Sequence, residues 1–184
     1  MSRPLRLIGL SGSLRRASVN TGLLRAAAEL LPAGAALEIA DIGELPLFNE
    51  DLRLAGPLPA VQALKDRLAG ADGVVFAVTE HNYTLSAALK NAIDWASRPP
   101  VESPLKGKPA LLMGAGGALG TGRAQYHLRQ VLVSLDMAVL NKPELLVPYA
   151  HQKFDAEGNL TDATVREQLR AQLEAFVAWA RRVG

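Results

Sequence analysis

The sequence predicts a single α/β domain built on a doubly wound parallel β-sheet with helices on both faces. Short apolar segments alternate with segments whose apolar residues recur at helical spacing. The apolar run at 73–78 is typical of a strand buried on both faces, as parallel sheets require. No repeat, low-complexity tract or linker divides the 184 residues, so one domain is expected to span 1–184.

The strands are predicted from apolar runs bounded by Gly, Pro or Asp. The run at 73–78 is expected to be central because it is the most apolar. The expected strands are 5–10, 37–40, 73–78, 110–113 and a split or paired last strand at 138–140 and 145–147.

The helices are predicted from apolar residues that fall on one face. Pro32 ends the first helix, and Ser86 or Thr84 is available as the N-cap of the third. Lys90 and Asp94 are spaced to pair on the outer face of that helix. The expected helices are 23–31, about 57–70 after a loop at 41–56, 85–96, 123–135, and a last helix that begins near 162.

Composition excludes several classes of protein. No window approaches the roughly 18 uninterrupted apolar residues of a membrane span, and the apolar stretch after Arg3 and Arg6 is too short for a signal peptide. We therefore expect a cytoplasmic protein with no membrane partner. The absence of cysteine excludes disulfides, thiol catalysis and thiolate metal sites, so redox chemistry would require a bound cofactor.

Charge and histidine placement exclude two further kinds of partner. The net charge is only +2 and the basic residues are scattered, so no nucleic-acid partner is expected. His127 and His151 have no companions at metal-ligand spacing, so no metal site is expected.

Three unusual loops follow predicted strands and should open onto one crevice at the carboxyl edge of the sheet. We call residues 11–20 the first loop, 79–86 the second loop and 114–122 the third loop. The first loop offers hydroxyls, an amide and two guanidinium groups ahead of a helix, which favours a bound phosphate. The alternative is a serine-rich turn in which Ser18 or Asn20 caps the helix and the arginines lie in solvent.

The loops do not fit three common motifs. No Gly-Lys-Ser/Thr follows the first loop, which disfavours nucleoside triphosphate hydrolysis, and Ser13 stands where a nucleophile elbow needs glycine. The third loop lacks the G-x-G-x-x-G spacing of a dinucleotide fingerprint. Its glycines indicate either close backbone approach to a planar ligand or a mobile loop.

Four segments resemble one known family, the NAD(P)H-dependent FMN reductases. Residues 79–95 resemble the family's "PEYN…LKNAIDW" loop and helix, and residues 12–20 resemble its G-S-L-R-x-x-S-x-N phosphate loop. Residues 123–130 and 141–144 resemble the branch that contains soluble quinone and chromate reductases. The resemblance runs from about residue 5 to 144. Thr79 and His81 depart from the proline and aromatic residue usual in the family.

The resemblance implies a flavodoxin-like fold of five parallel strands in the order 2-1-3-4-5, with FMN held non-covalently at the switch point. It implies ping-pong hydride transfer from NAD(P)H through FMN to a small acceptor such as a quinone, flavin, azo or nitro compound, or chromate. No side chain is expected to be catalytic, because the chemistry takes place on FMN.

The resemblance also implies which residues contact the cofactor. The phosphate would be held by the first loop, with Leu14 beside it in the motif: Ser11, Ser13, Arg15, Ser18 and Asn20. The isoalloxazine ring and ribityl chain would be bordered by the second loop: Glu80, His81, Asn82 and Tyr83. The other edge of the ring would be approached by the third loop: Ala115, Gly116 and Gly117.

A homodimer or homotetramer is a further implication of the resemblance. Tyr83, Arg123, Tyr126 and Glu144 match a polar cluster that the family places at a subunit interface. An ordinary surface ion pair is the alternative for Arg123 and Glu144. Two other functions stay open on this scaffold: a flavodoxin-type electron carrier, and a regulator that has lost the flavin.

Overall fold

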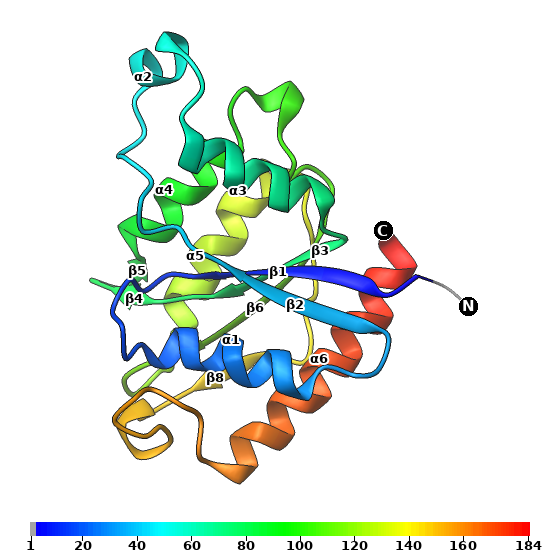
Figure 1. Ribbon diagram of the computed structural model, residues 1–184. Coiled ribbons are helices and arrows are strands. Elements are labelled where there is room, and N and C mark those ends of the chain that lie inside the picture. The colour runs from blue at the N-terminus through cyan, green and yellow to red at the C-terminus, as the bar shows by residue number, and fades with distance from the viewer. Residues whose placement is uncertain (1–2) are drawn as a thin grey trace.

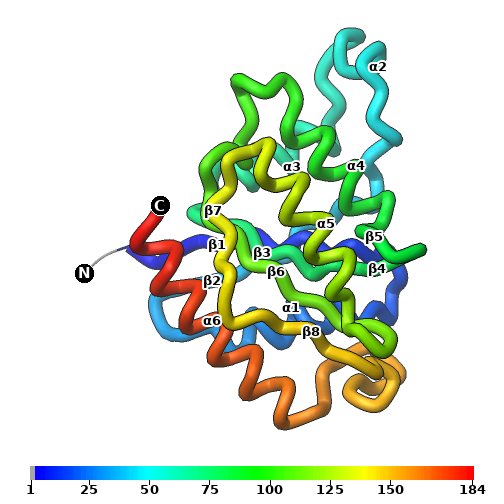
Figure 2. The backbone as a smooth tube through the Cα atoms, turned by 180° about the vertical axis from the view of Figure 1, so that it is seen from behind, coloured from blue at the N-terminus to red at the C-terminus, as the bar shows by residue number. Residues whose placement is uncertain are grey.

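The computed structural model describes residues 3–184. Its main sheet is parallel, with strands in the order β2-β1-β3-β6, and both β7 and β8 pair with β6 (Figure 1). The strands are β1 Leu5–Ser11, β2 Ala35–Ala40, β3 Gly73–Ala77, β6 Pro109–Ala115, β7 Ala138–Val139 and β8 Leu145–Val147. The predicted order is therefore confirmed, and Figure 2 shows β7 and β8 as the two pieces of the predicted split edge strand.

Helices cover both faces of the sheet, as predicted. One face carries α1 (Val19–Leu30) and α6 (Ala163–Val183); the other carries α3 (Pro59–Gly70), α4 (Ala87–Ala96) and α5 (Gly122–Val133) (Figure 1). Ser86 caps α4, as expected, and Asp162 caps α6. They accept hydrogen bonds from the backbone N–H groups of Leu89 and Val165.

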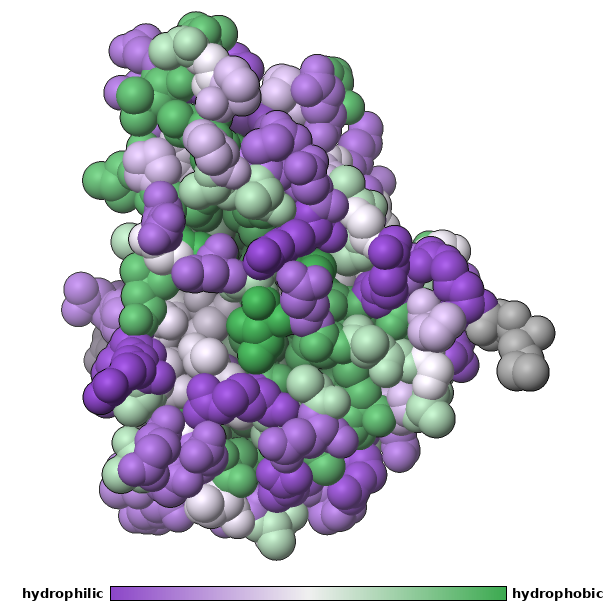
Figure 3. Space-filling model, in the orientation of Figure 1, coloured by the Kyte–Doolittle hydropathy of each residue, from purple (hydrophilic) through white to green (hydrophobic). Residues whose placement is uncertain are grey.

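The core consists of two apolar layers, one on each face of the sheet. Val74 and Phe76 of β3 face the layer under α3, α4 and α5, whereas Val75 and Ala77 face the layer under α1 and α6. Every residue of β3 is buried, which confirms the prediction of a strand covered on both faces. The edge strand β2 is only half-buried, and Figure 3 shows apolar side chains over it between the polar surfaces of the helices.

A short helix and a hairpin were not predicted. The segment expected to be a loop at 41–56 contains α2 (Glu50–Ala55), which Asn49 caps and which buries none of its residues. The second loop contains an antiparallel hairpin of β4 (Glu80–His81) and β5 (Thr84–Leu85). Short 3₁₀ turns, η1 (Pro100–Glu102) and η2 (Ala150–Gln152), complete the described elements.

The segment before α2 is held against α4. Asn91 accepts a hydrogen bond from the Phe48 N–H at 2.8 Å and donates to the Pro46 carbonyl at 2.9 Å. The Trp95 indole donates to the same carbonyl at 2.7 Å. Lys90 and Asp94 form the predicted pair on the outer face of α4, with Nζ and Oδ1 2.6 Å apart.

Among residues 3–184, no helix has the length and apolar content needed to cross a bilayer.

Candidate functional site

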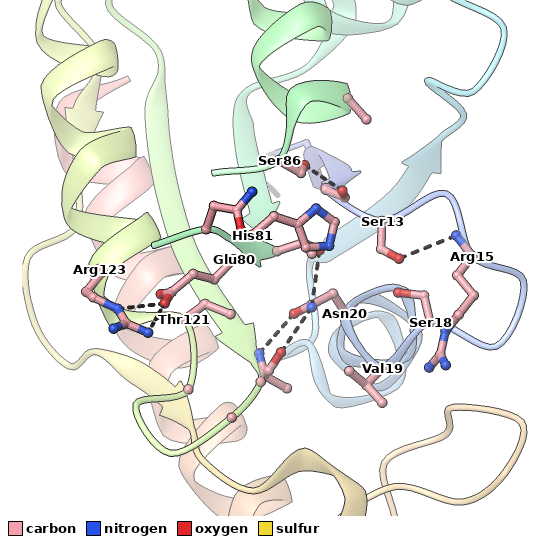
Figure 4. Close-up of a pocket in the computed structure, with 18 of the residues that line it drawn as sticks. Ser13, Arg15, Ser18, Val19, Asn20, Glu80, His81, Ser86, Thr121 and Arg123 are labelled. Atoms are coloured by element: carbon pink, nitrogen blue, oxygen red, sulfur yellow. Dashed lines mark hydrogen bonds and ion pairs between the residues drawn. The ribbon is translucent and has the colours of Figure 1, made fainter. Parts of the chain in front are cut away.

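The three loops border one cavity of about 840 Å³ beyond the carboxyl ends of β1, β3 and β6 (Figure 4). The expectation that they share one crevice is confirmed. Parallel strands end at the same edge of the sheet, so the loops that follow them converge there. The volume lies in the range of small-molecule and cofactor sites.

The first loop gives one end of the cavity its hydroxyl and guanidinium groups. Ser13, Leu14, Arg15, Ser18 and Asn20 all line the cavity. Ser18 caps α1, because its Oγ accepts a hydrogen bond from the Thr21 N–H at 3.2 Å. The Arg15 guanidinium donates to the Ala17 carbonyl at 2.6 Å, so this exposed side chain folds back over its own loop.

Ser11 differs from the other first-loop residues because it does not line the cavity. It is the last residue of β1 and is buried. Its Oγ accepts a hydrogen bond from the Thr21 hydroxyl at 2.8 Å and lies 3.3 Å from the Ser13 N and O atoms. Ser11 therefore supports the loop from below.

Asn20 joins the three loops to one another. Its Nδ2 donates to the Ala115 carbonyl at 3.1 Å and to the Thr79 hydroxyl at 3.3 Å, and its Oδ1 accepts from the Ala115 N–H at 2.9 Å (Figure 4). The side chain is almost fully buried. Ser86 makes a second connection, because its Oγ donates to the Gly12 carbonyl at 2.6 Å.

The second loop presents its hairpin at the rim of the cavity. Asn82 and Tyr83 both have positive φ angles, 48° and 69°, the conformation that a two-residue type I′ hairpin turn requires. Asn tolerates this conformation, but it is uncommon for an aromatic residue. His81, Asn82 and Tyr83 all line the cavity, and Tyr83 is 67% exposed.

Glu80 fixes this hairpin to α5. Its carboxylate accepts a hydrogen bond from Arg123 Nε at 2.7 Å and from the Ala124 N–H at 3.2 Å, and it is also paired with Arg123 Nη2. Thr121 makes no side-chain cap, so the buried Glu80 carboxylate supplies the negative group at the start of α5. The Arg123 guanidinium in turn lies 3.6 Å from the centre of the Tyr83 ring.

The polar cluster predicted at an interface is two separate groups within this chain. Arg123 pairs with Glu80 rather than Glu144. Glu144 pairs with Lys142, with Nζ and Oε2 2.7 Å apart. The hydrogen bond from Lys142, opposed by partial burial and reinforced by one from Tyr126, holds the pKa of Glu144 below its ordinary value.

The third loop walls the far end of the cavity with backbone. A Cβ added at Gly116 would lie 2.3 Å from the Gly120 carbonyl oxygen, so only glycine fits there. A Cβ at Gly117 would meet no atom within 4 Å, so the open side of this residue leaves its backbone approachable. Ala115, Gly116 and Gly117 all line the cavity, as predicted.

Several residues that line the cavity were not among those expected to contact the cofactor. Thr79 and Ser86, for example, line it through bonds to Asn20 and Gly12, which are distant in sequence. The residues not expected are Gly12, Val19, Thr79, Ser86, Ala87, Ala88, Ala118, Leu119, Gly120 and Thr121.

The site therefore has two ends of different chemistry. The first-loop end offers hydroxyls, a guanidinium and a helix N-terminus to an anion, and the other end offers a backbone wall to a flat group. Among residues 3–184, no group of three or more His, Asp or Glu side chains is arranged to hold a metal ion.

Comparison with known proteins agrees with this geometry. Residues 5–152 match the family described as NADPH-dependent FMN reductase. An NAD(P)H-dependent FMN reductase of Pseudomonas aeruginosa is 49% identical over 184 residues, which cover 100% of this chain and 99% of that protein. An NADPH:quinone oxidoreductase of Arabidopsis thaliana is 46% identical, with coverage of 97% and 93%.

The solved structures agree as well. The flavoenzyme NAD(P)H:(acceptor) oxidoreductase of Paracoccus denitrificans superimposes with a TM-score of 0.88 at 32% identity, covering 98% of this chain and 99% of that one. The chain therefore belongs to the NADPH-dependent FMN reductase family.

Proposed function

We propose that this protein is an oxidoreductase that binds FMN in the three-loop cavity and passes electrons from NAD(P)H to a small acceptor, with quinones as the first candidate. The observation that carries the proposal is the two-ended cavity, with an anion-binding loop at one end and a glycine backbone wall at the other, in a member of this family.

The first-loop end fits the phosphate of FMN. Ser13 and Ser18 offer hydroxyls and Arg15 offers a guanidinium, all beside the N-terminus of α1. These groups supply directed donors and a favourable helix dipole to a dianion. Asn20 and Ser11 hold this loop through their bonds to Ala115 and Thr21 and act on the phosphate indirectly.

The other end fits the isoalloxazine ring. His81, Asn82 and Tyr83 border it from the hairpin, while Ala115, Gly116 and Gly117 bring backbone close to its opposite edge. Glu80, which also lines the cavity, has its carboxylate engaged by Arg123 and fixes the hairpin in place. FMN, when bound, supplies the chemistry by taking a hydride from NAD(P)H and releasing electrons to the acceptor.

The residues of this chain contribute binding, orientation and exclusion. The hairpin residues His81, Asn82 and Tyr83 are exposed at the rim of the cavity, and a nicotinamide and then an acceptor would enter in turn on that side. Family membership favours this function over the flavodoxin-type carrier. Three further points stay predictions: flavin, azo, nitro and chromate compounds as acceptors, a cytoplasmic location, and assembly into a homodimer or homotetramer.

Steady-state turnover tests the proposal. Protein titrated with FMN should oxidise NADPH or NADH when a benzoquinone is present, with a rate that saturates at one FMN per chain. Arg15→Ala should need a higher FMN concentration for half-maximal rate. Turnover that does not depend on FMN, or FMN-loaded protein with no turnover on either nicotinamide, would contradict it.

A further inference from the structure

A compact loop after η2 packs against the first loop from outside the cavity. We call residues 153–162 the 153–162 loop. Its ends meet through the Lys153–Asp162 ion pair, with Nζ and Oδ2 3.2 Å apart, and through a bridge between the buried residues Phe154 and Leu160. Asn159 donates to the Asp155 carboxylate through its backbone N–H at 2.7 Å and through Nδ2 at 3.0 Å. The loop therefore holds its own shape.

The loop meets α1 and the first loop through two glycines. A Cβ added at Gly22 would lie 1.7 Å from the Gly158 carbonyl oxygen. A Cβ at Gly158 would lie 2.9 Å from both the carbonyl carbon and oxygen of Ala17, and 3.0 Å from the Ser18 carbonyl carbon. Gly158 also has a φ of 79°, in the left-handed region that favours glycine. Because every one of these neighbours is backbone, no side chain can move aside to admit a larger residue.

Arg25 fastens this contact from α1. Its Nε and Nη2 donate to Asn159 Oδ1 at 3.2 and 2.8 Å, and Nη2 lies 3.4 Å from the Glu157 carbonyl oxygen. The same side chain is therefore hydrogen-bonded to both residues that flank Gly158. Arg25 does not line the cavity and cannot contact a ligand there directly.

The contact between Gly158 and the first loop involves the carbonyl group to which Arg15 is hydrogen-bonded. The Ala17 carbonyl, against which Gly158 is pressed, accepts the hydrogen bond from the Arg15 guanidinium. The next residue, Ser18, is the N-cap of α1 and lines the cavity. A shift of the peptide at 17–18 would thus move both a guanidinium and a hydroxyl at the anion-binding end.

We propose that the 153–162 loop positions the phosphate-binding loop, with Gly158 and Arg25 as positioning residues that act through Ala17 and Ser18. This inference rests on the proposed function, because it assumes that the FMN phosphate binds at the first loop. An anion site whose donors are already fixed binds more tightly than one that must be ordered on binding. The 153–162 loop should therefore favour FMN over the same flavin without its phosphate.

The experiment compares FMN with riboflavin. Dissociation constants for both are measured by quenching of flavin fluorescence on wild type, Arg25→Ala, Arg25→Lys and Gly158→Ala. Arg67→Ala is the matched control, because it also removes one arginine and its polar contact, the Arg67–Glu38 pair with Nε and Oε1 3.4 Å apart, and it lies on α3, across the sheet from α1. Thermal unfolding checks that each variant is folded. If Gly158→Ala does not fold, the Arg25 variants still test the inference.

The readout is the preference for FMN, expressed as the riboflavin constant divided by the FMN constant. Arg25→Ala should lower this preference at least fivefold, Arg25→Lys should retain part of it, and Arg67→Ala should leave it unchanged. A purely structural role would weaken both flavins equally, so an unchanged preference in Arg25→Ala would overturn the inference. A wild type with no preference for FMN would overturn the phosphate assignment and this inference with it.

Discussion

The side chain of Asn20 and the backbone of Ala115 form a pair of hydrogen bonds, one in each direction, at 3.1 and 2.9 Å. The side-chain amide of Asn20, on α1, thus makes the two hydrogen bonds to the end of β6 that the backbone of a neighbouring strand would make. A third bond to Thr79 brings in the loop after β3. One buried side chain therefore holds the three walls of the cavity at fixed distances.

Replacing Asn20 by alanine should destabilise the protein. The substitution leaves the N–H and carbonyl of Ala115 without these partners in a buried place, which typically costs about 1–3 kcal/mol per group. Urea unfolding should show the loss. Asn141→Ala is the control, because the Asn141 side chain accepts its bond from Arg129 at the exposed surface, and it should change stability by less than about 0.5 kcal/mol. Equal losses of stability in the two variants would contradict the structural role of the Asn20 hydrogen bonds.

Arg15→Ala should weaken FMN binding while leaving the fold intact. A charge-assisted hydrogen bond contributes about 1.5–3 kcal/mol, so the dissociation constant should rise roughly 10- to 100-fold. Isothermal titration calorimetry measures it. Arg16 is exposed and does not line this cavity, so Arg16→Ala is the matched loss of one positive charge. If both variants bind FMN like wild type, the phosphate assignment fails.

The Glu80–Arg123 pair should show strong coupling in a double-mutant cycle. The Glu80 side chain is 9% exposed, so truncating Arg123 leaves a buried carboxylate short of its partner. We expect a coupling energy of about 1–3 kcal/mol from urea unfolding of Glu80→Gln, Arg123→Ala and the double variant. The exposed Arg170–Glu167 pair on α6 should give less than about 0.5 kcal/mol. Coupling no larger than that control would show that the pair does not fix the hairpin.

Stability should depend on pH through Asp162, the N-cap of α6. The backbone N–H of Val165, followed by Lys153, holds the pKa of Asp162 below its ordinary value. A lowered pKa in the folded state means that the charged form adds stability above about pH 4, which is lost as the pH falls through the folded-state pKa. Asp162→Asn should therefore cost more stability at pH 7 than at pH 3 in urea unfolding. The same cost at both pH values would show that the charge contributes nothing.

The protein should be an oligomer in solution. Tyr126 is 54% exposed beside Glu144, and Tyr83 is exposed over Arg123, so the residues that resemble a family interface are free to meet another subunit. Light scattering at micromolar concentration should give the mass of a dimer or tetramer. A monomeric mass would remove the interface interpretation of these residues.

Most of the architecture could be predicted because apolar periodicity reflects burial directly. The buried strand β3, the split edge strand and the cap Ser86 all follow from local pattern. The helix α2 could not be predicted, since it buries no residue and so carries no apolar stripe. The hairpin was missed because its turn, Asn82-Tyr83, lacks the glycine that usually marks such turns.

The site could be located from the sequence, but the direction of its side chains could not. The composition of the three loops and the family resemblance named most residues that line the cavity. The partners of Glu80 and Asn20 lie 43 and 95 residues away along the chain, and only the fold brings them together. The same holds for Ser11, whose hydroxyl accepts a hydrogen bond from Thr21 and which does not line the cavity.

The most direct test of the central claim is an anaerobic absorbance titration of the FMN-loaded protein with NADPH and NADH. We predict that the visible flavin absorption disappears with about one equivalent of nicotinamide per chain and returns when a benzoquinone is added. Protein that binds no FMN, or bound FMN that neither nicotinamide reduces, would contradict the proposal that this cavity passes electrons from NAD(P)H to a small acceptor.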